Sequence, residues 1–315
     1  MPTRETTPAY TALTASAALV DRSDRGKLAL TGSQAKAALN GVVTNETETL
    51  TPGTGMYAAV LTPKGRMVGD LRVLDVGDDL LLDTERAALQ GVFDVVRHGL
   101  VGFDAELDKR TLQRGLLSLI GPASRAICGA PDLPDDEHAN AAALIGGHEV
   151  LLVATDVGVD VICQADATSA VAQALEAAGA VPVSEPDAEV VRIESGRPRY
   201  GVDLDDSVIP QEAGLNDRAV NFTKGCYVGQ ETVARLFYKG KPNRHLRGLQ
   251  LSGPAATGDE LRLGERTVGV LTSAAGSPRL GDIGLALVRR EAEPGAMLTV
   301  GDGEATAVVV ALPFG

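Results

Sequence analysis

The stretch LALTGSQAKAAL, at residues 28–39, and the stretch LSLIGPASRAIC, at residues 117–128, follow one pattern. Each begins with a short apolar run, turns at a glycine and continues into small residues that favour a helix. Ser33 in the first copy and Pro122 in the second both suit the first turn of a helix. The two copies predict a pseudo-symmetric pair of α+β units, offset by about 90 residues.

The segments that follow each copy support the same interpretation. After the first copy, residues 57–84 predict three strands joined by turns, and residues 85–100 have the apolar spacing of a helix. After the second copy, residues 148–166 predict two strands, and residues 167–179 predict a helix that ends at Gly179. Both units therefore combine a small sheet with helices.

The chain changes character from about residue 245. Short apolar runs alternate with Gly, Asp and Pro turns, with little helix, which predicts a small all-β barrel or sandwich. The segment YKGKPNR, at residues 238–244, marks a boundary, because Pro242 and the glycine-flanked lysines resist regular structure. We therefore expect three domains, at residues 1–112, 113–240 and 241–315.

The composition excludes several classes of protein. The 315 residues carry a formal net charge of −13, so an anionic partner such as nucleic acid would need a local basic patch. No stretch has the character of a signal peptide or a membrane span. The three cysteines are widely spaced and lack C-x-x-C spacing, which argues against a disulfide framework or a structural zinc site. These features predict a cytoplasmic protein without a metal site.

Two acidic residues are candidates for a binding site. Alternation along RMVGDLRVLDV places Asp70 on one face of a strand with Arg72. The two side chains could form a pair on a solvated strand, or Asp70 could be a partly buried carboxylate that accepts hydrogen bonds from a ligand amine. In VVRIESGRPRYGVDL, strand alternation puts Glu194 on the face opposite Val191 and Ile193. Glu194 could be a surface charge, or it could bind an amidine-like edge through two parallel hydrogen bonds.

The stretch KGCYVGQETVARLF, at residues 224–237, is more specific. Its apolar spacing predicts a helix that starts near Val228–Gly229, so Cys226 lies just before the N-terminus of that helix. The neighbouring Lys224 and the helix dipole would both lower the pKa of the Cys226 thiol. The alternative is that Cys226 is a small residue packed in a tight turn.

The same part of the chain is basic. Between Lys224 and Arg247 there are six Lys or Arg residues and one Glu, a local charge of +5, so the remainder of the chain sums to −18. Three of the ten Phe and Tyr residues also lie here, namely Tyr227, Phe237 and Tyr238. A basic segment with aromatics suits a polyanionic ligand that carries rings, such as a folate with its glutamate tail or single-stranded RNA. A solvated linker is the alternative.

The octapeptide KGCYVGQE resembles the signature of the YgfZ family, the folate-binding relatives of the glycine-cleavage T-protein, which is an aminomethyltransferase. The stretch RIESGRPRYGVDLDDSVIPQEAGL, at residues 192–215, and the C-terminal run that ends in LPF are similar to segments of the wider superfamily. The resemblance extends over nearly the whole chain. It implies a three-domain ring with two pseudo-repeated α+β domains and a C-terminal β-barrel around a folate pocket.

The resemblance also implies roles for particular residues. The expected ligand is tetrahydrofolate or a derivative, and the expected folate-binding residues are Asp70, Glu194, Tyr200, Tyr227 and Arg235. The expected catalytic residues are the reactive thiol Cys226 and Lys224. The described role of the YgfZ family is support of iron–sulfur cluster assembly or repair and of enzymes that carry such clusters, with a link to tRNA modification.

The octapeptide distinguishes between branches of the superfamily. A T-protein normally lacks Lys-Gly-Cys here, and a thiolate has no evident use in aminomethyl transfer. We therefore expect a tetrahydrofolate-binding protein whose partners are iron–sulfur client proteins or cluster-assembly factors, with no permanently bound cluster. An aminomethyltransferase that acts on a lipoyl carrier is the second hypothesis. An RNA-binding accessory protein is the third, and the overall acidity counts against it.

Overall fold

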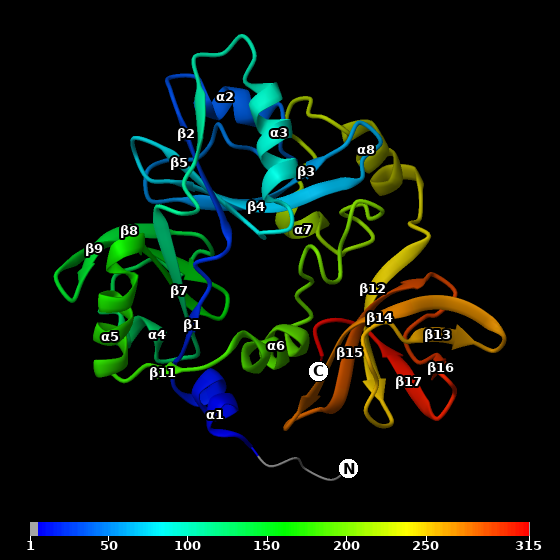
Figure 1. Ribbon diagram of the computed structural model, residues 1–315. Coiled ribbons are helices and arrows are strands. Elements are labelled where there is room, and N and C mark those ends of the chain that lie inside the picture. Colours follow the sequence, from blue (N-terminus) through cyan, green and yellow to red (C-terminus); the bar gives the residue numbers. More distant parts are fainter. Residues whose placement is uncertain (1–5, 315) are drawn as a thin grey trace.

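The computed structural model describes residues 6–314, and Figure 1 shows three parts arranged as a ring. A five-stranded sheet lies at the top of the view, a six-stranded sheet lies at the left, and a closed barrel lies at the lower right. The expected α+β fold with two related units and a C-terminal β-barrel is confirmed. Within residues 6–314, no helix combines the length and the apolar character that crossing a membrane requires.

The first sheet is antiparallel, in the order β3-β4-β5-β2-β6. Helix α3 is amphipathic and packs against this sheet through Leu89, Val92 and Val96, which lie on one face. The bounds are β2 Gly26–Thr31, α2 Ala35–Asn40, β3 Gly55–Leu61, β4 Met67–Asp75, β5 Leu80–Thr84, α3 Leu89–Gly99 and β6 Glu106–Lys109.

The second sheet has the order β11-β1-β7-β10-β9-β8. Helix α5 covers its core through Val171 and Leu175, and Gly179 follows the helix with a φ of +109°. The bounds are β1 Ala18–Asp21, β7 Arg114–Ile120, α4 Ser124–Ile127, β8 Asn140–Ile145, β9 His148–Thr155, β10 Gly158–Gln164, η1 Ala165–Ala167, α5 Thr168–Ala177 and β11 Val181–Pro182.

The two copies of the repeat fold alike. Each places its strand, β2 or β7, before a glycine in the left-handed region, with a φ of +108° at Gly32 and +125° at Gly121. A Cβ at Gly32 would lie 2.4 Å from the carbonyl oxygen of Asp104, and one at Gly121 would lie 2.5 Å from that of Ser16. Both the backbone conformation and the close packing therefore require glycine at this turn.

Strand β1 belongs to the second sheet, although it precedes the whole first sheet in the sequence. It pairs antiparallel with β7, with Ala18 opposite Ile120, and parallel with β11. Helix α1 (Pro8–Ala15) contacts this side of the molecule as well. The domain boundary at residue 112 stays a prediction. Strand β1 precedes this boundary in the sequence, but both of its partner strands follow it.

The barrel closes in the order β12-β15-β14-β13-β16-β17. Its interior is filled by aliphatic side chains such as Leu249, Leu261 and Leu271, as alternation along short strands predicts. The bounds are β12 Arg244–Leu251, β13 Glu260–Leu263, β14 Arg266–Ser277, β15 Gly281–Arg289, β16 Met297–Val300 and β17 Ala305–Val310.

The strand expected around Glu194 is wrong, because this segment forms helix α6 (Glu185–Glu194). Ser184 and Asp187 form a reciprocal capping box, and a proline occupies the first turn. These signals start a helix, and they override the alternation read from the residues that follow. Helix α6 contacts β14 and β15 of the barrel, so it connects the second sheet to the barrel (Figure 1).

The segment after α6 crosses back to the first sheet. It contains two helices, α7 (Asn216–Ala219) and α8 (Gln230–Lys239). Its buried residues, including Leu204, Leu215 and Tyr227, share a core with Ala59 and Leu61 of β3. The octapeptide segment, placed with the second unit in the expected division, therefore packs on the first sheet. Helix α8 begins at Gln230, as the apolar spacing predicts.

Candidate functional site

Two adjoining cavities lie where the two sheets face each other. The larger measures about 380 Å³ and the smaller about 200 Å³, and we call the two together the central cavity. They share a wall that includes Arg22, Arg25, Glu85, Arg197 and Arg199. This wall brings together the turn before β2, the end of β5 and the segment after α6.

Asp70, in the middle of β4, is buried and lines the smaller cavity. The Tyr57 hydroxyl, on the neighbouring strand β3, donates a hydrogen bond to Asp70 Oδ2 at 2.6 Å. Burial raises the pKa of Asp70 to about 6, although the hydrogen bond from Tyr57 opposes this rise. A carboxyl group that is half ionised near pH 6 can accept a hydrogen bond from a ligand or hold a proton.

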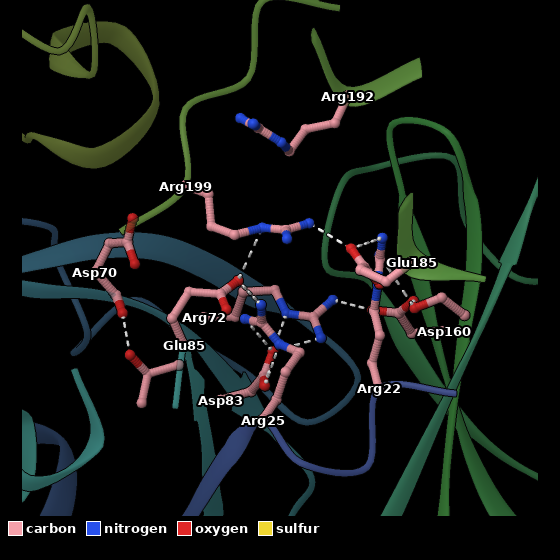
Figure 2. A network of polar contacts seen from close by, with 12 residues as sticks. Arg22, Arg25, Asp70, Arg72, Asp83, Glu85, Asp160, Glu185, Arg192 and Arg199 are labelled. Carbon is pink, nitrogen blue, oxygen red and sulfur yellow. Dashed lines mark hydrogen bonds and ion pairs between the residues drawn. The ribbon is translucent and has the colours of Figure 1, made fainter. Parts of the chain in front are cut away.

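Arg72, on the same strand, links the two sheets. Its Nε donates to Asp83 Oδ2 at 2.6 Å, and its NH1 donates to Asp160 Oδ2 on β10, also at 2.6 Å (Figure 2). The alternative of a solvated Asp70–Arg72 pair is wrong, because both side chains are buried and each has other partners. Asp70 and Arg72 share a face of β4, as the alternation predicts, but that face lines the smaller cavity and is buried.

Asp83 holds two arginines in place. Arg25 pairs with both carboxylate oxygens of Asp83, at 3.0 and 3.2 Å, and Arg72 bonds to the same group. Burial opposes the ionisation of Asp83, but the two guanidinium groups outweigh burial and lower its pKa to about 2. Asp83 is therefore ionised at neutral pH. It holds Arg25 and Arg72, which line the smaller cavity together with Asp70.

A second cluster joins β1 to α6. Arg22 pairs with both oxygens of Glu185, at 2.8 and 3.0 Å, and Arg199 donates to the same carboxylate (Figure 2). Arg199 also forms an ion pair with Glu189 at 2.6 Å. Burial opposes ionisation of Glu185, but Arg22 and Arg199 outweigh it and lower the pKa of this carboxyl. The larger cavity thus has a wall of paired charges.

The charges that line the central cavity nearly cancel. Seven arginines face eight carboxyl groups, and one of these, Asp70, has a pKa near 6. The arginines are Arg22, Arg25, Arg72, Arg192, Arg197, Arg199 and Arg218. The carboxyl groups are Asp21, Asp24, Asp70, Glu85, Glu137, Asp156, Asp160 and Glu185. A cavity with this balance favours a polar ligand of low net charge over a polyphosphate.

Aromatic side chains form part of the wall around Asp70. Tyr200, expected as a binding residue, lines the smaller cavity with Tyr57 and His138. Tyr57 is not among the residues predicted from the sequence, although its place opposite Arg72 on the neighbouring strand puts it diagonal to Asp70. The Arg218 guanidinium lies 5.1 Å from the Tyr57 ring centroid.

His138 was also missed, and no local pattern marks it. Its backbone φ is +73°, unusual for a residue other than glycine, and neither ring nitrogen has a hydrogen-bond partner among the described residues. Burial lowers the pKa of His138 to about 3, and Arg72 and Arg218 add to this effect. The imidazole is therefore neutral at physiological pH.

Glu194 is buried at the end of α6, but its carboxylate is already occupied. Tyr10 donates to it at 2.9 and 3.2 Å, Ser277 of the barrel donates to it as well, and Arg279 lies 3.8 Å away. Its neighbours Arg192 and Ser195 line the larger cavity, whereas Glu194 is not among the lining residues. Glu194 therefore does not line the cavity that contains Asp70. A ligand would have to displace the Tyr10 hydroxyl from the Glu194 carboxylate in order to bind there.

Lys224 is buried, and its ammonium binds backbone carbonyl groups. Its ammonium donates to the carbonyl oxygens of Asn40, Val43 and Asn45 at 2.7, 2.8 and 2.8 Å. Burial lowers the pKa of Lys224 to about 8. Because an ammonium has three N–H donors, these contacts leave none for the Cys226 thiol. The geometry therefore favours a structural role for Lys224 over the expected assistance to the thiol.

The other candidates of this segment lie outside the central cavity. Cys226 is exposed just before α8, whereas Cys128 and Cys163 are buried. Tyr227 is buried in the core beneath α8, where burial raises its pKa to about 12. Arg235 is exposed on α8. Among the lining residues of the central cavity, none of these appears, so their binding roles stay predictions. No three His, Cys, Asp or Glu residues of the described chain are grouped as a metal site would require.

Comparison with solved structures defines the class of protein. The fold matches the glycine cleavage system aminomethyltransferase T from Bartonella henselae with a TM-score of 0.86 and 21% sequence identity. The match covers 98% of this chain and 88% of that one. Two α+β units, a closed barrel and a central cavity thus define a protein with the aminomethyltransferase-like fold.

Comparison of sequences defines the family. Residues 5–224 match the GCVT N-terminal domain, and residues 244–314 match the glycine cleavage T-protein C-terminal barrel domain. The chain therefore belongs to the glycine cleavage T-protein family, which is a folate-utilising, aminomethyltransferase-like family.

Two curated relatives span most of the chain. An aminomethyltransferase of Rubrobacter xylanophilus is 29% identical over 310 residues, which cover 95% of this chain and 83% of that protein. A chloroplastic protein of Arabidopsis thaliana, named as a transferase, is 27% identical over 307 residues, which cover 94% and 71%. The narrower resemblance to the YgfZ branch stays a prediction.

Proposed function

We propose that the protein binds tetrahydrofolate or a derivative in the central cavity. The observation that carries this proposal is the buried Asp70 carboxyl, which lines a cavity within a fold used by a folate-utilising family. A reduced pterin ring offers N–H and amino groups, which a carboxylate can accept. The near balance of charge in the wall suits this polar, uncharged ring, and the larger cavity is of the size that small ligands occupy.

Calorimetric titration with tetrahydrofolate tests the binding proposal. We expect saturable, one-to-one binding by the wild type and a loss of about 10-fold to 100-fold in affinity for Asp70→Asn, since a hydrogen bond to a charged group contributes about 1.5–3 kcal/mol. Asp205→Asn, a change at an acidic residue outside the cavity lining, is the matched control. Equal affinity of wild type and Asp70→Asn would remove Asp70 from the site.

We further propose that this folate protein supports the assembly, repair or maintenance of iron–sulfur enzymes in the cytoplasm, with an effect on tRNA modification. The support for this step is the KGCYVGQE octapeptide and the exposure of its cysteine, Cys226, in a chain whose other two cysteines are buried. An exposed thiol is available to an iron–sulfur client protein or a cluster-assembly factor, whereas a buried one is not.

Complementation tests the iron–sulfur role. In cells that lack the protein, we expect the wild type to restore the activity of a cluster-dependent enzyme and Cys226→Ala to fail. Val228→Ala changes a neighbouring residue that is also exposed, so it serves as the control and should restore activity. Full rescue by Cys226→Ala would make the cysteine a passive residue of the turn.

Aminomethyl transfer from a lipoyl carrier is the second candidate. The family match and the 29% identical aminomethyltransferase favour it. Its test is turnover of an aminomethylated lipoyl carrier with tetrahydrofolate, followed by release of ammonia and formation of methylenetetrahydrofolate. Turnover that depends on Asp70 and not on Cys226 would establish this candidate in place of iron–sulfur support.

A further inference from the structure

Helix α8 is held firmly against the first sheet, and this fixes which of its faces points outward. Val233 on its inner face is buried in the core that β3 contributes to. Gly229, at the start of the helix, has a φ of +84°, and a Cβ there would lie 2.6 Å from the carbonyl oxygen of Thr62. The helix therefore packs directly on the turn between β3 and β4. Its opposite face, which includes Arg235 and Tyr238, is exposed.

Aromatic side chains gather on the exposed side of α8. Phe222 stacks on Phe237 with ring centroids 3.8 Å apart, and Tyr238 meets Phe237 edge-on at 5.0 Å. Phe237 is 45% exposed and Tyr238 is 65% exposed. The whole chain has only ten Phe and Tyr residues and no Trp, so this exposed cluster is a concentrated apolar surface.

Three exposed cations flank Phe237 and Tyr238 in the sequence. Arg235, Lys239 and Lys241 are exposed, and Arg235 shares a helical face with Tyr238 and Lys239. Across residues 6–314, none of the three cations forms an ion pair, whereas Arg244, just beyond them, pairs with Glu212. We call this surface the α8 patch, and it consists of Phe222, Arg235, Phe237, Tyr238, Lys239 and Lys241.

The α8 patch contrasts with the rest of the molecule. Residues 224–247 carry a charge of +5, whereas the remaining residues sum to −18. An acidic partner is therefore repelled by most of the surface and attracted here, which orients its approach. Aromatic residues and arginine inside such a surface are the residue types that supply most binding energy in protein interfaces.

We propose that the α8 patch is the docking surface for a partner protein that presents a hydrophobic side chain within an acidic face. The identity of this partner as an iron–sulfur client rests on the proposed function, whereas its chemistry follows from the patch. Cys226 lies four residues before α8 and Tyr238 lies eight residues into it, a span of at most about 26 Å along the chain, so the thiol lies within the breadth of an ordinary protein interface centred on the patch. Single-stranded RNA is the less favoured occupant, because a strand carries a charge at every phosphate and would extend beyond the patch over a surface whose remaining charge of −18 repels it.

Charge reversal combined with complementation tests the proposal. The variant Lys239→Glu/Lys241→Glu and the variant Tyr238→Ala should each lower the restored activity of a cluster-dependent enzyme at least fivefold. Both should keep the tetrahydrofolate affinity of the wild type within twofold, since the patch does not line the central cavity. Arg262→Glu/Arg266→Glu reverses two exposed cations of the barrel and is the matched control, for which full rescue is expected.

The possible results distinguish the docking surface from the proposed iron–sulfur role and from RNA binding. Full rescue by both patch variants, next to a wild type that rescues, overturns the docking surface and leaves the proposed function intact. Failure of the wild type to rescue overturns the iron–sulfur role and the docking inference together. Binding of a fluorescent 12-nucleotide poly(U) by the wild type, abolished by Lys239→Glu/Lys241→Glu, would assign the patch to RNA and overturn the protein partner.

Discussion

The carboxyl group of Asp70 titrates within the range of pH at which binding can be measured. Its pKa is raised to about 6, so it is ionised at pH 8 and mostly protonated at pH 5. If the ionised form accepts a hydrogen bond from tetrahydrofolate, affinity should be constant above pH 7 and fall up to tenfold for each pH unit below 6. Calorimetry from pH 5 to 8 provides the profile, and Asp70→Asn should flatten it. A wild-type profile as flat as that of the variant would show that the protonation state of Asp70 does not affect binding.

His138 makes the stability of the fold depend on pH in a defined direction. Its pKa is about 3 in the folded protein and about 6.5 in an unfolded chain, so the unfolded state binds the extra proton between these values. Stability therefore falls as the pH drops from 6.5 toward 3, by about 1.4 kcal/mol per unit. Arg72, Arg218 and Arg197 oppose protonation, Asp83 favours it, and Glu137 Oε1 lies 3.7 Å from His138 Nε2, where it would pair with a charged imidazole.

Comparison with His138→Asn isolates this effect, because asparagine accepts a positive φ and does not titrate. Between pH 6.5 and 5, urea unfolding should show that the wild type loses about 2 kcal/mol more than the variant. The opposing titration of Asp70 is present in both proteins and cancels in the difference. Parallel loss of stability in the two proteins would mean that the His138 imidazole gains a proton as easily in the folded state as in the unfolded state.

Among the secondary-structure elements, α2 depends on a residue that is distant in sequence. The Lys224 ammonium donates to the carbonyl of Asn40 at the end of α2 and to two carbonyls in the following turn. Lys224→Met should lower the free energy of unfolding by about 2–4 kcal/mol, because three backbone carbonyl acceptors, one buried and two half-buried, lose their charged donor. Lys239→Met, on the exposed end of α8, should change it by less than about 0.5 kcal/mol. Denaturant titration of both variants makes the comparison.

Local signals account for the elements that could be predicted from the sequence. The repeat was visible because a glycine with positive φ follows β2 and β7 at the same place. The barrel was visible because its short strands alternate between frequent turns. Helix α6 carries an equally local signal in the capping box of Ser184 and Asp187, which outweighs the alternation of the residues near Glu194.

Contacts between distant parts of the chain could not be predicted. The partner of Arg72 on the second sheet, Asp160, lies 88 residues away, and no spacing in one sequence relates the two. The burial of Asp70 and of the His138 imidazole, whose nitrogens have no hydrogen-bond partner among the described residues, depends on how the two sheets meet. The sequence therefore indicated Asp70 as a candidate residue, whereas the composition of the cavity around it required the tertiary structure.

At the scale of the whole molecule, Glu194 joins three parts of the ring. It lies on α6 and accepts hydrogen bonds from Tyr10 on α1 and from Ser277 on the barrel. If Glu194 binds the pterin ring, the Tyr10 hydroxyl competes with the ligand for its carboxylate. Tyr10→Phe should then strengthen tetrahydrofolate binding about threefold to tenfold, as expected when one hydrogen bond no longer has to be broken.

Fluorescence titration of Tyr10→Phe provides the measurement, and Tyr238→Phe removes an exposed hydroxyl as the control. Unchanged affinity in Tyr10→Phe would indicate that the ligand contacts Asp70 and does not contact the Glu194 carboxylate. It would leave Glu194 as a residue that ties α1 and the barrel to α6.

The position of β1 also affects how the chain is made. Its partners β7 and β11 are synthesised about 100 and about 160 residues later, which corresponds to roughly 5–20 s for β7 at ordinary rates of translation. Strands β2 to β6 can pair during this interval, whereas Ala18–Asp21 has no partner outside the ribosome. We expect the nascent chain to expose an apolar, unpaired strand for several seconds, and this is the period in which it depends most on protection from aggregation.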